Sequence, residues 1–374
     1  MSARADRRDV LGYRVRAQQL DRAPDSQPPT AAAILDLGVQ DSGTDAASWS
    51  LANRGARMPN AIALQESEEF ALAWTLRGAP HFYRRAELPD IQTATSPYSD
   101  ADAAKRIYDA NRPLKAAGIS AREALAVIAQ KMRSLGAAPM AKGEMSAALT
   151  QRLTAPYLRS CRVCQAVHPY EMPFRLAALH AGIELQPGTS PPILRPVPGW
   201  PERPAEPASD PDAAPQTLWP IRAYLRLLGP AKPAEVAAFL DAPVADVKKR
   251  WPPDATEVTV DEETLWALGS DLQVPTDPVV RLLGPFDLFL QAKDRHRLVP
   301  DASRHKQLWP ILGRPGALLA GTEVVGVWRP RAAGGKFSVR LDPWQKLSPS
   351  IRLQVEEQAA RLASHRGLVF TGVI

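Results

Sequence analysis

The sequence predicts an α+β protein composed of several small domains. Its 374 residues exceed the usual length of a single domain. Blocks with helical periodicity at 9–90, 117–195 and 217–270 each end in a short strand-like segment. From Pro278 onward the chain is instead rich in strand-like runs such as GALLAGTEVVGVWRP. Helices and strands therefore concentrate in different parts of the chain, as expected for the α+β class.

The segment 217–275 has the clearest pattern. Its first helix, WPIRAYLRLLG, ends at a Gly-Pro pair, and a second short helix, PAEVAAFL, follows. A four-residue turn leads to a third helix, ADVKKRW, after which TEVTV and LWAL predict a β-hairpin around DEET. Helix, helix, turn, helix and hairpin in this order form the winged helix-turn-helix plan.

The rest of the chain divides into four further segments. Two are expected to repeat the winged-helix plan, because each has helices followed by a strand-like run. The third contains seven prolines and is expected to be a solvated, semi-rigid linker. The fourth is a basic β-rich subdomain, which a helix and a short strand complete. The predicted boundaries are 1–98 and 99–195 for the two modules, 196–216 for the linker and 276–374 for the subdomain.

Capping patterns and apolar spacing place individual elements. Ser120 with Glu123 three residues later forms a capping box, and Ser348 or Ser350 begins the last helix. A helix is also expected at 67–76, ahead of a strand at HFYRRAEL.

The charge distribution indicates a polyanionic partner. The net charge is +6 with a pI near 9.4, and residues 281–374 alone carry fifteen Lys/Arg against seven Asp/Glu, a surplus of +8. Ordinary basic solubility charge is the alternative. No apolar run is long enough to span a membrane, and MSARADRRDV lacks the apolar core of a signal peptide. Two cysteines fit a reducing cytosol, so a cytoplasmic protein is expected.

Two groups of cations are candidate DNA contacts. Lys248, Lys249 and Arg250 lie in the third helix of the 217–275 segment, where a recognition helix neutralises phosphates. The second group belongs to a hairpin at 324–341, in which alternate residues of the second strand share one face. A protein-binding winged helix and a plain amphipathic hairpin are the respective alternatives. The hairpin cations are Arg329, Arg331, Lys336 and Arg340.

The spacing C-x2-C-x3-H at Cys161, Cys164 and His168 is compatible with a zinc site. Zinc takes four ligands, so Glu171, His180 or water would have to complete it. A turn in which the two thiols and the imidazole pack without metal is the favoured alternative. We therefore expect no cofactor.

With these segments described, the chain resembles the AlkZ/YcaQ-like winged-helix family, which includes DNA glycosylases that remove N7-alkylated purines and unhook interstrand crosslinks. The resemblance runs along nearly the whole chain, through RVRAQQL, LGVQDSGTDAASWSLANRG, AWTLRGAPHFYRRAEL, LLGPFDLFLQAKDRHRLVP and VVGVWRP. It implies three tandem winged helices and a C-terminal β-rich subdomain around a DNA-sized concavity. It also implies a monomer that binds double-stranded DNA at the nucleoid. Further DNA contacts are expected within the matching segments, at Arg77, His81, Arg295 and Arg297.

The catalytic motif of the family is altered in this sequence. Family glycosylases carry Gln-x-Gln or Gln-x-Asp, and Gln40 matches the first glutamine. The second polar position falls on Ser42, whereas an acid stands one place earlier, at Asp41. An N7-alkylated purine is already cationic, so the enzyme mainly stabilises a positively charged sugar and aligns a water.

We expect Asp41 to act as base and electrostatic stabiliser while Gln40 holds the water and Ser42 hydrogen-bonds. A non-catalytic DNA-binding protein, regulatory or damage-shielding, is the alternative. A protein-binding scaffold ranks last, because it leaves the basic C-terminal quarter unexplained.

Overall fold

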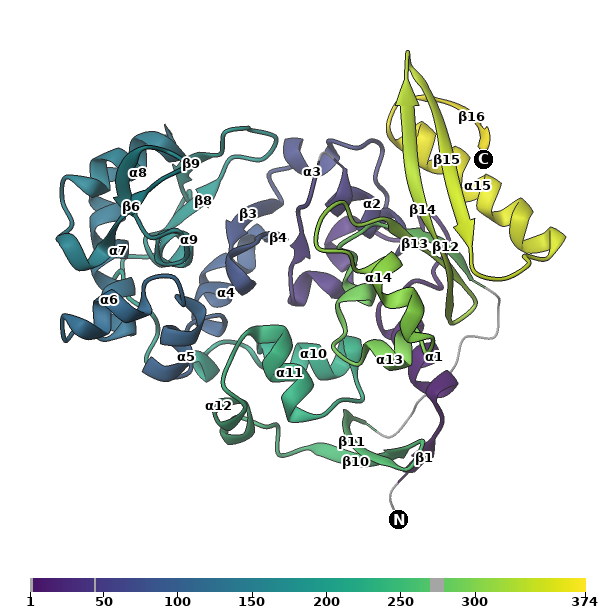
Figure 1. Ribbon diagram of the computed structural model, residues 1–374, viewed down its shortest axis with the longest axis horizontal. Coiled ribbons are helices and arrows are strands. Elements are labelled where there is room, and N and C mark those ends of the chain that lie inside the picture. The colour runs from purple at the N-terminus through teal and green to yellow at the C-terminus, as the bar shows by residue number, and fades with distance from the viewer. Residues whose placement is uncertain (1–2, 44, 270–278) are drawn as a thin grey trace. The chain divides into compact units, whose positions relative to one another are not determined.

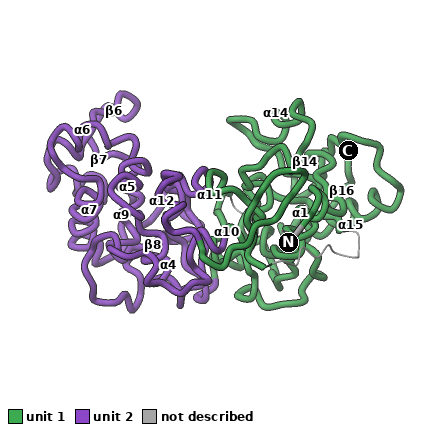
Figure 2. Tube along the Cα trace, turned by 90° about the horizontal axis from the view of Figure 1, so that it is seen from below, with its two compact units in different colours: residues 1–66, 224–236, 252–374 green, residues 67–223, 237–251 purple. Residues whose placement is uncertain are grey.

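A computed structural model describes residues 3–43, 45–269 and 279–374 (Figure 1). The chain divides into two compact units, each assembled from segments distant in sequence (Figure 2). Unit 1 comprises Met1–Glu66, Tyr224–Val236 and Pro252–Ile374, and unit 2 comprises Ser67–Ala223 and Ala237–Trp251. The predicted module at 217–275 is shared between the units, and its C-terminal boundary lies outside the described residues. Among the described residues, no helix has both the length and the apolar character needed to cross a membrane.

A five-stranded sheet in the order β12-β13-β14-β15-β16 forms much of unit 1 (Figure 1). Neighbouring strands are antiparallel except for the parallel pair β15–β16. Helix α15, whose N-terminus is capped by the Ser348 hydroxyl, packs against β12 and β15. The β-rich character, final helix and last strand expected after Pro278 are therefore confirmed. The bounds are β12 Val280–Leu283, β13 Gly316–Ala320, β14 Glu323–Ala333, β15 Lys336–Pro343, α15 Pro349–His365 and β16 Val369–Val373.

A smaller sheet of unit 1 has the order β1-β10-β11. The antiparallel pair β10–β11 is the hairpin expected around DEET, and its turn residues Asp261 and Glu262 have left-handed φ values of 46° and 69°. Val10 of α1 packs on the apolar face of this hairpin. The other bounds in unit 1 are β1 Ala3–Ala5, α1 Arg7–Ala17, β2 Val39–Gln40, α2 Ala46–Ala52, α3 Ala63–Glu66, β10 Ala255–Val260, β11 Glu263–Leu268, α13 Arg295–Leu298 and α14 His305–Leu308.

The three helices expected before that hairpin are present in the predicted order. They are α10 (Pro220–Leu228), α11 (Pro233–Leu240) and α12 (Val244–Lys249). Helices α10 and α11 each begin in one unit and end in the other, whereas α12 belongs wholly to unit 2. The sequence thus predicted the elements of this segment, while its boundary as a separate module remains a prediction.

Unit 2 is built on antiparallel strands that follow one another as β4-β3-β8-β9-β5. Helices α7 and α9 pack together, and α4 covers a cluster that includes Ala71, Tyr83 and Leu179. The bounds are β3 Phe70–Trp74, β4 Pro80–Arg84, α4 Leu88–Ala94, α5 Asp100–Arg106, α6 Asn111–Ala116, α7 Ala121–Leu135, β5 Met140–Ala141, α8 Lys142–Thr150, β6 Leu158–Cys161, β7 Ala166–Pro169, α9 Glu171–His180, β8 Ile183–Leu185 and β9 Ile193–Pro196.

Two expectations for unit 2 are wrong. The helix expected at 67–76 is mainly strand β3, all five of whose residues are buried. A strand covered on both faces shows a continuous apolar run, which periodicity does not distinguish from a buried helix. The segment 196–216 is not a fully solvated linker, because Val197 and Ala214 are buried in the same cluster as α4, although many of the residues between them are exposed.

Candidate active site and basic surfaces

The segment expected to carry chemistry lies at the end of β2 in unit 1. Gln40 and Ser42 line a small pocket together with Asp287 and Gln291, and the cavity volume is about 10 Å³. A volume of this size holds about one water molecule. Asp41 lies between Gln40 and Ser42 in the sequence and is not among the described residues that line the pocket.

Asp41 is the acid of the segment Gln40–Ser42, and its side chain is half-buried. Burial raises its pKa from 3.8 to about 6, and a hydrogen bond from the Gly43 backbone only partly opposes this shift. Gly43 has a φ of 149° and open space where a side chain would begin, so the loop leaves β2 along a path that favours glycine. The Asp41 carboxyl therefore exchanges its proton at a pH close to neutrality.

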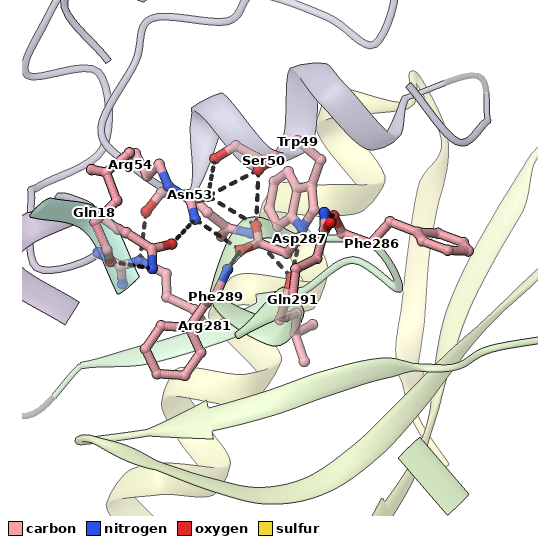
Figure 3. A network of polar contacts seen from close by, with 12 residues as sticks. Gln18, Trp49, Ser50, Asn53, Arg54, Arg281, Phe286, Asp287, Phe289 and Gln291 are labelled. Atoms are coloured by element: carbon pink, nitrogen blue, oxygen red, sulfur yellow. Dashed lines mark hydrogen bonds and ion pairs between the residues drawn. The ribbon is translucent and has the colours of Figure 1, made fainter. Parts of the chain in front are cut away.

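A fully buried ion pair between Arg54 and Asp287 supports the pocket (Figure 3). Both Arg54 terminal nitrogens donate to the Asp287 carboxylate at 2.8 Å, the Ser50 hydroxyl donates at 2.8 Å and the Phe289 N–H donates at 3.0 Å. Burial alone would raise the pKa of Asp287, but Arg54 and these donors outweigh it, and the pKa is lowered. Asp287 is thus a satisfied, ionised carboxylate.

The same network ties four distant segments of unit 1 together. Arg54 also donates to the Gln18 side-chain oxygen at 2.8 Å, and the Gln18 amide donates to the Leu227 carbonyl at 3.0 Å. Trp49 and Asn53 of the α2 region both donate to the Leu282 carbonyl, at 2.7 and 3.1 Å (Figure 3). Sequence reasoning missed this network. The sequence signal that could have indicated it is Asp287, a charged residue inside the apolar run GPFDLFLQ, since a buried charge requires a partner.

The hairpin β14–β15 carries the predicted basic face. Arg329 lies opposite Arg340 and Arg331 lies opposite Ser338, so these side chains share one side of the two strands. Phe337 and Val339 of β15 are buried on the other side, as the alternation predicted. The four cations of this basic face are Arg329, Arg331, Lys336 and Arg340, and all are exposed with no ion pair to a described residue.

Arg297 is wrong as an exposed DNA contact. Its side chain is 3% exposed, is bonded to Glu263 and lies 3.8 Å from Asp294. Asp294 is in turn paired with the buried Arg14 at 2.7 Å. Arg297 therefore belongs to an internal ion-pair cluster. Its neighbour Arg295 is exposed and lies over the Trp309 ring, 4.8 Å from the centroid.

The expected contacts in unit 2 also divide into buried and exposed groups. His81 is 2% exposed, and burial lowers its pKa to about 3, so it is a neutral interior residue and wrong as a DNA contact. Arg77 donates to the Phe239 carbonyl at 2.8 Å, and Arg250 is paired with Asp212. The remaining two, Lys248 and Lys249, are exposed near the end of α12.

Comparison with known proteins identifies the family to which this arrangement belongs. The family model described as DNA glycosylase AlkZ-like matches residues 34–365. The chain belongs to the AlkZ-like DNA glycosylase family. This confirms the resemblance, and the matched region includes β2, the Gln40–Ser42 segment, Asp287 and the basic hairpin.

A solved structure shows the same fold. The DNA glycosylase AlkZ of Streptomyces sahachiroi aligns with a TM-score of 0.74 and 19% sequence identity, covering 99% of this chain and 99% of that chain. No curated protein matches the chain. The α+β class is confirmed, and membership in a family of DNA glycosylases makes DNA the expected partner of this AlkZ-like chain.

Proposed function

We propose that the protein is a monofunctional DNA glycosylase that hydrolyses the N-glycosidic bond of N7-alkylated purines in double-stranded DNA, acting as a monomer at the nucleoid. The observation that carries the proposal is the Gln40–Asp41 pair at the end of β2, within a chain of the AlkZ-like family. The half-buried acid has a pKa of about 6, and the adjoining pocket has room for about one water.

The proposed chemistry relies on charge already present in the substrate. Alkylation at N7 makes the purine a cationic leaving group, so the bond from the sugar to the base breaks with its electron pair neutralising the base. The Asp41 carboxylate stabilises the positive charge that develops on the sugar. Gln40 orients a water through its side-chain amide, and the water adds to the sugar carbon while its proton passes to Asp41.

The pKa of Asp41 suits this work. A carboxyl with an ordinary pKa is a weak base at neutral pH, whereas one with a pKa of about 6 is still mainly ionised at pH 7.5 and accepts a proton more readily. Asp287 is a poor candidate for this role, because Arg54, Ser50 and Phe289 already occupy its oxygens. Asp41 is the better base because its described polar contact is a single backbone hydrogen bond.

We further propose that the basic face of β14–β15 contacts the phosphates of the duplex, with Arg295 and the pair Lys248–Lys249 as additional contacts. Exposure and the absence of an ion pair among the described residues support these positions for the hairpin and for α12. Phosphate contacts of this kind position a protein on DNA without reading its sequence.

A glycosylase assay tests the proposal. Duplex DNA bearing one N7-methylguanine is incubated with the protein in excess, and strand cleavage by alkali reports abasic sites. We expect product with the wild type, and we expect Asp41→Asn to lower the single-turnover rate by about 10² or more, as loss of a general base does. The matched control is Glu356→Gln, the same chemical change at an exposed position on α15.

A wild type that binds this DNA but releases no base would overturn the glycosylase proposal. It would instead establish the alternative, a non-catalytic regulatory or damage-shielding DNA-binding protein, which Ser42 at the second polar position of the motif favours. If Asp41→Asn keeps the wild-type rate, Asp41 is not the base, and Gln40→Ala and Ser42→Ala then assign the role within the same pocket.

A further inference from the structure

The hairpin β6–β7 in unit 2 gathers three metal-binding side chains at its tip. One ligand atom from each of Cys161, Cys164 and His168 lies within 4.8 Å of the others. Cys161 is half-buried and Cys164 is exposed, and Val163 beside them is 94% exposed. The thiols therefore do not fill an apolar interior.

The backbone of the turn is folded around the first thiol. The Cys164 N–H donates to the Cys161 Sγ at 3.5 Å. Gln165, immediately after the second cysteine, has a left-handed φ of 53°, and its side chain donates to the Arg162 carbonyl. This conformation brings the chain back from Cys164 so that β7 returns alongside β6, with Ser160 opposite Val167.

His168 is oriented for coordination. Its Nδ1 lies 2.8 Å from the Pro169 carbonyl, which can only accept a hydrogen bond, so Nδ1 carries the proton. The lone pair is then on Nε2. A backbone carbonyl that fixes the tautomer in this way is the usual outer partner of a metal-bound histidine.

We propose that Cys161, Cys164 and His168 bind one Zn²⁺ ion, with the fourth position open to water. Two thiolates and one imidazole are ligands that zinc prefers, and three protein ligands with one water form a recognised tetrahedral set. The other residues considered from the sequence are occupied elsewhere. Glu171 is paired with Lys142 and Arg175, and His180 is buried and hydrogen-bonded to Gln92.

The ion would stabilise the hairpin tip. Strands β6 and β7 have four residues each, and a two-stranded hairpin of this size is marginally stable without further support. Residues 162–167 are all exposed, so apolar packing contributes little at the turn. Coordination would compensate for the missing packing, because the ion would join Cys161 at the end of β6 to His168 in β7.

Cobalt uptake tests the site directly and independently of glycosylase activity. The reduced full chain is freed of metal with a chelator, and Co²⁺ is titrated under anaerobic conditions, followed by displacement with Zn²⁺. We expect one equivalent of Co²⁺ to produce a thiolate-to-metal charge-transfer band and the visible bands of tetrahedral cobalt, and Zn²⁺ to abolish both. Cys161→Ser and Cys164→Ser should each remove the charge-transfer intensity in part and weaken binding at least tenfold.

The histidine is tested with a matched pair. His168→Ala should weaken Co²⁺ binding at least tenfold, whereas His296→Ala, at an exposed histidine of α13, should leave it unchanged. All these positions are at least partly exposed, and circular dichroism verifies that the variants fold. Reduced wild type that takes up no Co²⁺ overturns the proposal, as does uptake that survives Cys161→Ser with full charge-transfer intensity.

Discussion

Asp41 and Asp287 are two carboxylates of unit 1 whose pKa values shift in opposite directions, although burial alone raises both. Asp287 is fully buried, but Arg54 and two further residues donate to it, and its pKa is lowered. Asp41 is only half-buried, but burial raises its pKa to about 6, and the backbone hydrogen bond from Gly43 offsets this shift only in part. A carboxylate surrounded by donors supports structure, whereas a carboxylate that burial has made more basic is suited to accept a proton.

The largest effect should come from breaking the buried pair. Asp287→Ala leaves the Arg54 guanidinium buried without its partner, and we expect the free energy of unfolding to fall by about 3–5 kcal/mol. Urea denaturation followed by tryptophan fluorescence measures this change. If Asp287 is structural, the paired change Arg54→Met with Asp287→Leu should recover much of the loss, because it removes both charges. A loss below about 1 kcal/mol for Asp287→Ala would show that the pair does not support unit 1.

The sequence was sufficient to identify Asp41 as a candidate, but it did not predict the buried ion pair of Asp287. Gln40 and Asp41 were identifiable because they follow an apolar run and precede a glycine turn, within a segment that resembles the family motif. The Arg54–Asp287 pair was not, because it joins residues 233 positions apart and only the folded chain brings them together. Residue type showed that Asp41 could be charged, but not how much of its hydration it loses.

Local periodicity explains the successes and failures elsewhere in the fold. Alternation identified the two faces of β15, since a strand with one buried face repeats every second residue. The same rule failed for β3, which is buried on both faces. Among the cations, sequence could not separate exposed Arg295 from buried Arg297 two positions later, because Glu263, the partner that neutralises Arg297, is brought to it only by the fold.

The second prediction concerns the stability cost of Asp41. Its pKa is higher in the folded chain than the 3.8 of the free group, so protonation favours the folded state. The associated stability is fully present below pH 4 and is lost as the pH rises through about 6. Asp41→Asn should therefore stabilise the protein above pH 6, by about 1–2 kcal/mol after allowance for the water that still reaches the side chain, and should have no effect below pH 4.

Ionisation of Asp41 should lower the stability of the wild type and raise its rate, so two measurements should both follow the pKa of about 6. Thermal denaturation from pH 4 to pH 8 should show the stability gain of Asp41→Asn growing with pH. The single-turnover rate of the wild type should fall as the pH drops through about 6, because the base becomes protonated. A wild-type rate that is flat between pH 5 and pH 8 would separate Asp41 from the chemistry, even if the stability gain is observed.

The smallest expected effect is on DNA affinity, and it comes from comparing exposed arginines with a buried one. Arg329 and Arg340 are exposed across from each other on β14 and β15, whereas Arg297 is held in an internal cluster. The double change Arg329→Gln with Arg340→Gln should leave stability unchanged and lower the affinity for duplex DNA. If each arginine contacts one phosphate, the slope of log affinity against log salt should decrease by about 2, at about 0.9 for each contact.

Fluorescence anisotropy with a labelled duplex at several salt concentrations measures this slope. The control removes two exposed charges from α6, with Arg112→Gln and Lys115→Gln, and should leave the slope unchanged. Arg297→Gln should show the opposite behaviour, with lower stability and a slope like that of the wild type, because its charge is already neutralised by Glu263. An equal decrease in slope for the hairpin and α6 variants would mean that net charge, rather than the basic face of the hairpin, attracts the DNA.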